Sequence, residues 1–249
     1  DALRFSLIIN SGQDIFISKE KFEIGRNFAN KIWNASRLVF TNCPIPLESG
    51  DYENLDVKSL DLPSRWIISS FYETLEKTSR AIENYSYSEA ENLVQDFFWG
   101  NYCDWYLELI KAKFTDHHIQ KTALFILKNS LKMMHPFIPF VTEEIYSKMN
   151  NIDTCLSQAA WPKLNKDLID AKAFNEMQTV IDVISAIRNI RTQWKVKPND
   201  TVDVTLVPEN ESQEQILMAN QGDIKRIGRI KNLTIDSRVQ TLKESASQL

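Results

Sequence analysis

Residues Gly25–Phe40 read GRNFANKIWNASRLVF, and the spacing of their apolar side chains predicts one long amphipathic helix. With about 3.6 residues per turn, three faces separate on that helix. The core face carries Phe28, Ile32, Ala35, Ser36 and Val39. The aromatic ridge carries Phe22, Trp33 and Phe40. The basic-amide face carries Arg26, Asn27, Asn30, Lys31, Asn34 and Arg37.

The basic-amide face is unusual for an acidic protein. Asp and Glu are absent from Ile24 to Leu47, although the 249 residues include 33 acidic and 29 basic side chains. A solvated helix ordinarily mixes both signs, because opposite charges at i,i+4 support it. Basic side chains neutralise phosphates, amide side chains hydrogen-bond to the edges of nucleobases, and aromatic rings stack on unpaired nucleobases. The face therefore indicates nucleic-acid contact, and a solvated polar face beside a packed aromatic ridge is the alternative.

Composition and periodicity together predict a mostly α fold. The chain contains only 6 Gly and 8 Pro, and this low number favours long helices over a turn-rich β protein. Helical spacing occurs at residues 1–10, 18–41, 63–85, 88–114, 116–135, 140–149 and 167–196. Alternating residues then predict strands at 201–208 and 232–237 around a short helix at 211–222. We expect a connector at 1–17, a helical bundle at 18–197 and a small α+β subdomain at 198–249.

Several classes of protein are disfavoured by composition. The three cysteines, Cys43, Cys103 and Cys155, form no CxxC pair, so neither a disulfide framework nor a zinc site is expected. They suit a reducing, cytoplasmic setting. No apolar run reaches the roughly 18 residues of a membrane span, and we expect no membrane association. The chain starts without Met inside an apolar run, which is typical of a fragment.

Six segments carry a family resemblance. They are DALRF at 1–5 with GQDI at 12–15, GRNFANKIWNASRLVF at 25–40, FFWGNYCDWYLELIK at 97–111, LKMMHPFIPFVTEEIY at 131–146, AAWP at 159–162 and VISAIRNIRTQWKVKP at 183–198. In this order they resemble the anticodon-binding region of class I aminoacyl-tRNA synthetases, and the GQDI loop before RNFANK resembles the valyl branch. Isoleucyl and leucyl enzymes share the helical architecture and remain alternatives.

The resemblance implies recognition of the anticodon stem-loop of valine tRNA for a catalytic domain outside this chain. We expect the basic-amide face, Arg26, Asn27, Asn30, Lys31, Asn34 and Arg37, to contact the tRNA, with Trp33 and Phe40 as stacking platforms. The resemblance makes Arg188 and Arg191 a second tRNA-facing surface, and a solvated helix end whose cations favour the helix dipole is the alternative. The parent enzyme would use ATP, Mg²⁺ and valine. The chain has neither the His-Ile-Gly-His nor the Lys-Met-Ser-Lys-Ser signature, so we expect no catalytic residue, cofactor or metal site here. No heptads form a C-terminal coiled-coil arm. We expect a monomer whose partners are tRNA and the rest of the synthetase.

Three further expectations concern a pair of acids, a stripe of aromatic residues and a rival function. Asp104 and Glu108 are an i,i+4 pair of acids, which we expect to pair with an Arg inside the bundle rather than to perform acid–base chemistry. Trp99, Tyr102 and Tyr106 form a stripe that predicts core packing. A helical protein-interaction domain, whose basic face docks an acidic partner, is the rival function from another class.

Overall fold

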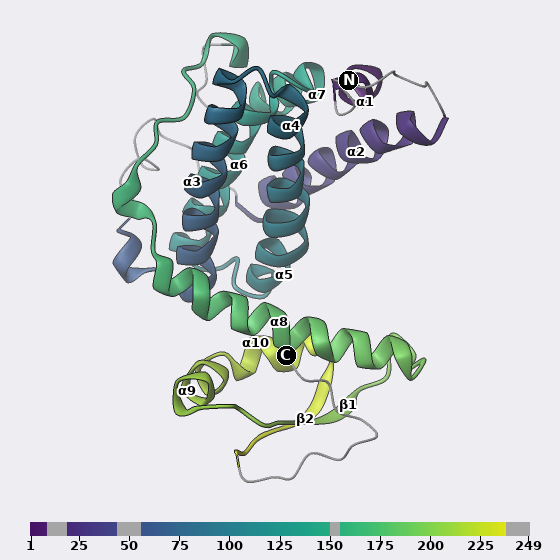
Figure 1. The fold of residues 1–249 in the computed structure, drawn as a ribbon, viewed down its shortest axis with the longest axis vertical. Coiled ribbons are helices and arrows are strands. Elements are labelled where there is room, and N and C mark those ends of the chain that lie inside the picture. The colour runs from purple at the N-terminus through teal and green to yellow at the C-terminus, as the bar shows by residue number, and fades with distance from the viewer. Residues whose placement is uncertain (9–18, 44–55, 150–154, 238–249) are drawn as a thin grey trace. The chain divides into compact units, whose positions relative to one another are not determined.

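The computed structural model describes residues 1–8, 19–43, 56–149 and 155–237 (Figure 1). As predicted, the fold is mostly α with a small α+β part. It divides into two compact units, residues 1–170 and 171–249. The division differs from the expected boundary at 197, because the long helix before the first strand packs on the elements that follow it. The GQDI loop lies outside the described residues.

The first unit is a helical bundle. Its α-helices are α1 Ala2–Ile8, α2 Lys19–Asn42, α3 Leu62–Glu83, α4 Tyr87–Asp96, α5 Leu107–Ile110, α6 His117–Met134 and α7 Pro139–Tyr146. The π-helix η2 spans Phe97–Tyr106, and the short 3₁₀ turns are η1 Val57–Ser59, η3 Leu156–Gln158 and η4 Lys166–Leu168. Helices α3, α4 and α6 pack on one another, and α2 crosses them while contacting α1, η2, α6 and α7 (Figure 1).

Side-chain caps explain where these helices begin. Asp61 accepts a hydrogen bond from the Ser64 amide at 3.1 Å at the start of α3, and Asp116 accepts from the His118 amide at 2.8 Å at the start of α6. The Asp1 carboxylate caps α7 from a distance, because it accepts from the amides of Phe140 and Val141 at 3.0 and 2.6 Å. Each contact satisfies a donor that the helix itself leaves unpaired.

The segment predicted as one α-helix over 88–114 is instead α4, η2 and α5 in succession. A π-helix this long is rare, and aromatic side chains anchor it. The Tyr102 hydroxyl donates to the Ala123 carbonyl at 2.8 Å, and the Tyr106 hydroxyl lies 3.2 Å from Ser64 Oγ. Both tyrosines are fully buried and Trp99 is half-buried, so the core-packing prediction is confirmed for the tyrosines.

In its described residues, 171–237, the second unit combines three helices with a two-stranded parallel sheet. Its elements are α8 Ala171–Gln193, β1 Val202–Leu206, α9 Glu211–Ala219, α10 Gln221–Gly228 and β2 Ile230–Ile235. Val202 pairs with Ile230 and Leu206 with Ile235. Asn210 caps α9 by accepting from the Gln213 amide at 2.9 Å. Both predicted strands are present, and the short helix between them is two helices, α9 and α10.

Candidate nucleic-acid interface

Helix α2 presents the predicted basic-amide face on its exposed side. All five predicted core-face residues are buried, and Phe28, Ile32 and Val39 are fully so. Arg26, Asn27, Asn30, Asn34 and Arg37 are exposed, whereas Lys31 is half-buried. The predicted separation of a buried face from a polar face on this helix is therefore present in the structure. On the same helix, Glu23 approaches Arg26 at 3.7 Å in an exposed pair, which contributes little in water.

The aromatic cluster beneath the face holds α2 in place. Phe28 lies with its ring centroid 4.8 Å from that of Phe5 on α1. It also stacks on Trp99 of η2 at 6.3 Å with an interplanar angle of 10°. Rings from three elements therefore meet at one fully buried residue, so the exposed side chains of α2 project from a rigid base.

The aromatic ridge is only partly available for stacking. Trp33 is 40% exposed, but the Lys148 ammonium lies 4.6 Å from its ring centroid and covers part of it. Phe22 and Phe40 are half-buried. The same Lys148 ammonium lies 2.5 Å from the Glu144 carboxylate, so its charge is already paired and a base can stack only on the uncovered part of the Trp33 ring.

Lys31 is held by two residues of η2. Its ammonium lies 2.6 Å from Asp104 Oδ1 and 5.1 Å from the centroid of Trp99. The sequence pattern did not reveal this carboxylate, because Asp104 is 73 residues away in the chain. The expected pairing of Asp104 and Glu108 with an Arg in the core is wrong. Both side chains are close to half-exposed and pair with lysines, Asp104 with Lys31 and Glu108 with Lys111.

In the second unit, the two arginines predicted to contact tRNA, Arg188 and Arg191, differ in exposure and in hydrogen bonding. Arg188 is exposed on α8. The Arg191 guanidinium donates from Nη2 to the carbonyls of Lys197 and Asp200 at 3.1 and 2.8 Å. It therefore closes the turn between α8 and β1, and its head group is already engaged.

The buried titratable groups of the bundle are unsuited to nucleophilic chemistry. Burial raises the pKa of the Cys43 thiol to about 12, and burial likewise raises the pKa of Cys103 to about 12. Both thiols stay protonated at neutral pH and are poor nucleophiles. Burial lowers the pKa of His135, whose Nδ1 lies 2.9 Å from Thr142 Oγ1. Across the described ranges, no three His, Cys, Asp or Glu side chains gather as a metal site.

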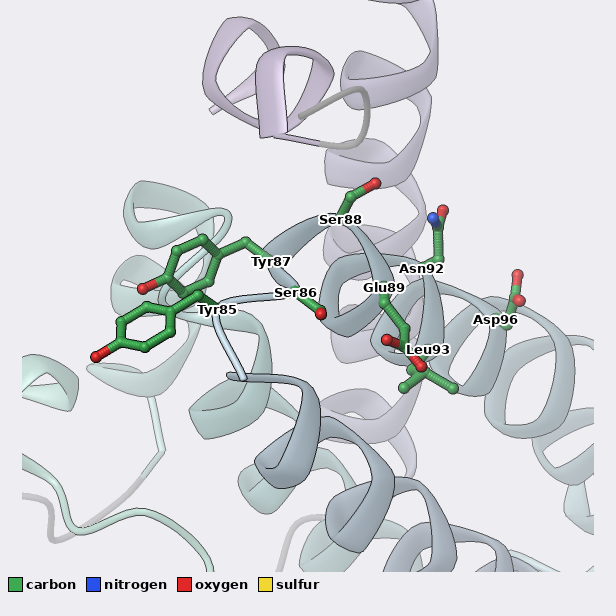
Figure 2. Close-up of a pocket in the computed structure, with 8 residues that line it drawn as sticks. All are labelled: Tyr85, Ser86, Tyr87, Ser88, Glu89, Asn92, Leu93 and Asp96. Atoms are coloured by element: carbon green, nitrogen blue, oxygen red, sulfur yellow. The ribbon is translucent and has the colours of Figure 1, made fainter. Parts of the chain in front are cut away.

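An open hollow at the turn from α3 to α4 has the opposite charge (Figure 2). It measures about 760 Å³, and Tyr85, Tyr87, Glu89 and Asp96 are among the residues that line it. Tyr85 is 79% exposed and adopts a left-handed φ of 59°. The carboxylates of the hollow would repel phosphate. The signal in the sequence is the absence of Lys and Arg between Arg80 and Lys111.

No described helix is both long enough and apolar enough to cross a bilayer.

The candidate surface is a face of α2 that carries cations and amides above packed aromatic rings. Such a face can bind a folded polyanion whose bases are unpaired.

Comparison with known proteins identifies the family. Residues 64–206 match the family described as the anticodon-binding domain of tRNA ligases. Valine–tRNA ligases of a Nostoc species and of Bacillus cereus are 34% and 33% identical over 94% and 100% of this chain. The chain spans only 26% and 29% of their lengths. A LeuRS chain from Agrobacterium radiobacter K84, solved in a ternary complex with tRNA and LeuAMS, covers 69% of this chain with a TM-score of 0.52 and 15% identity. This chain covers 20% of that LeuRS chain, and the likeness concerns the fold.

Proposed function

Because the chain belongs to the family of anticodon-binding domains of tRNA ligases, we propose that it reads the anticodon loop of valine tRNA within a valine–tRNA ligase. The observation that carries the proposal is the exposed basic-amide face on a helix whose opposite side is buried. The similarity to valine–tRNA ligases over nearly the whole chain supports the choice of valine.

The exposed residues divide by chemistry. Arg26 and Arg37 carry forked guanidinium groups, which bind phosphates and also the acceptor edges of bases. Asn27, Asn30 and Asn34 can each donate and accept, which suits the edges of adenine and cytosine. Valine codons begin with GU, so the anticodon ends in adenine and cytosine. These two bases are what the face must read.

The remaining predicted contacts take supporting roles in the proposal. Trp33 supplies a ring for a splayed base, and Phe40 borders it. Arg188 on the second unit binds phosphate. Arg191 orders the turn beside it. The remainder of the ligase would hold the sites for ATP, Mg²⁺ and valine, and the protein would act as a monomer.

The test is a binding titration of the 249-residue chain with a valine-tRNA transcript and with the same transcript carrying other anticodons. We expect the valine anticodon to bind best, and isoleucine and leucine anticodons to bind more weakly. A domain that docks acidic proteins would instead bind heparin or an acidic protein in preference to tRNA, with no dependence on the anticodon. That outcome would contradict the proposal.

A further inference from the structure

The proposed function gives no role to Asp104, an acidic residue beside the basic-amide face. Asp104 lies next to Lys31, at the edge of a surface where a carboxylate should oppose RNA binding. Resting on the proposed function, we infer that Asp104 is a base-reading residue, whose carboxylate accepts a hydrogen bond from the exocyclic amino group of the last anticodon base.

One contact, the ion pair with Lys31, positions the carboxylate of Asp104. Its Oδ1 lies 2.6 Å from the Lys31 ammonium, and that ammonium lies over Trp99 at 5.1 Å. Trp99 in turn stacks on Phe28, which is fully buried. The carboxylate is thus pre-organised, and little freedom is lost when it binds a ligand.

The exposed part of Asp104 can still reach a ligand. Its side chain is 49% exposed, whereas that of Lys31 is 29% exposed. Within the described part of the chain, no hydrogen bond other than the one from Lys31 involves this carboxylate. Lys31 also offsets the negative charge, so a phosphate backbone can approach without facing an isolated anion.

The chemistry of a carboxylate determines which bases it selects. An ionised carboxylate only accepts hydrogen bonds. Cytosine presents its N4 amino group as a donor, and Asp is one of the side chains that accept from it. Uracil and guanine present carbonyl acceptors at the equivalent positions, which a carboxylate repels. Isoleucine anticodons differ from valine anticodons by uracil in place of the final cytosine. Asp104 would therefore separate the two.

A purely structural ion pair is the competing explanation for this geometry. It would orient Lys31 and affect all tRNAs equally. The two explanations differ in one measurable quantity, the ratio of affinities for tRNA that ends its anticodon in cytosine or in uracil. Removal of a negative charge alone would raise affinity for both tRNAs and leave the ratio unchanged.

The test uses Asp104→Asn in the 249-residue chain. The amide keeps the shape of the carboxylate but can also donate to uracil O4, so it should accept either base. We expect the wild-type chain to favour cytosine by about tenfold, and the variant to bind both tRNAs to within about twofold. Glu108→Gln is the matched control, because it removes a similarly exposed carboxylate one turn further along and should preserve the wild-type ratio. Thermal melts confirm that each variant is folded.

The outcomes distinguish this inference from the function on which it rests. If the wild-type chain does not depend on the anticodon, both are overturned. If it discriminates and Asp104→Asn retains the wild-type ratio, only the role of Asp104 is overturned, and the carboxylate is a structural partner of Lys31. A ratio that collapses in Asp104→Asn and survives in Glu108→Gln supports the inference.

Discussion

Gly25 of α2 lies directly against the backbone of Ala2 in α1. A Cβ atom at position 25 would lie 2.4 Å from the Ala2 carbonyl oxygen and 2.9 Å from its Cα. Neither contact can be relieved by rotating a side chain, because both atoms belong to the backbone. The approach of the two helices therefore requires glycine at the start of GRNFANK.

Gly25→Ala should consequently destabilise the bundle. Forced overpacking of this kind costs about 1–3 kcal/mol. Gly100→Ala is the matched control, because a Cβ there would meet nothing within 4 Å beyond its chain neighbours and the backbone of its own helix. Urea denaturation of both variants is the measurement. Equal midpoints for the two variants would show that α1 moves aside without cost.

The buried carboxyl group of Glu91 on α4 should make the free energy of unfolding depend on pH in an unusual way. It is fully buried, and its two oxygens lack hydrogen-bond partners among the described residues. Burial raises its pKa from 4.5 to about 9, against the opposing attraction of Arg4. Between these values the folded state retains a proton that the unfolded state releases. Its contribution to stability is therefore greatest below about pH 4.5 and is lost as pH rises towards 9.

Glu91→Gln should remove the contribution of this group to the slope of the free energy of unfolding against pH. Each pH unit in this window costs the wild-type chain up to about 1.4 kcal/mol from this group. Urea denaturation at several pH values across the same window should give a flatter profile for the variant. Parallel profiles would mean that Glu91 is ionised in the folded chain.

Arg191 should matter more for folding than for RNA binding. Arg191→Ala leaves the carbonyls of Lys197 and Asp200 without their guanidinium donor, so the turn into β1 should loosen. Hydrogen exchange at residues 195–202 should accelerate, by an amount equivalent to about 1–3 kcal/mol. Arg188→Ala is the comparison, and we expect weaker tRNA binding with unchanged exchange in that turn. Unchanged exchange in Arg191→Ala would contradict the structural role.

The salt dependence of binding should reflect how many exposed arginines meet phosphates. Lys31 and Arg191 are half-buried, whereas Arg26, Arg37 and Arg188 are exposed to solvent. At about −0.7 for each phosphate neutralised on a single strand, the slope of log K against log salt should be roughly −2. Titrations at several salt concentrations measure it. A slope near zero would mean that binding is not electrostatic.

Local periodicity was enough to predict most of the helices, both strands and the three faces of α2, since each depends on residues close in sequence. It did not predict the π-helix η2. An uninterrupted aromatic pattern fits an α-helix equally well. The π-helical geometry depends on contacts with residues distant in sequence, such as the hydrogen bond from Tyr102 to the Ala123 carbonyl. The partner of Lys31 was missed for the same reason, because pairing across 73 residues is a property of the fold. The polarity of a helix face is thus easier to predict than which of its charged side chains pair with other parts of the chain.

The decisive prediction concerns the exposed side chains of α2. Arg37→Ala or Asn34→Ala should weaken binding of valine tRNA and reduce discrimination against a changed anticodon, by about 1–3 kcal/mol for each base that the removed side chain would read. Both side chains are exposed on a helix that is held by its opposite face, so the substitutions should leave the fold intact. Tyr85→Ala is the control, because it removes an exposed side chain from the acidic hollow and should leave tRNA binding unchanged. Titrations against both tRNAs, with thermal melts alongside, measure these effects. Unaltered discrimination in folded Arg37→Ala and Asn34→Ala proteins would show that another surface reads the anticodon.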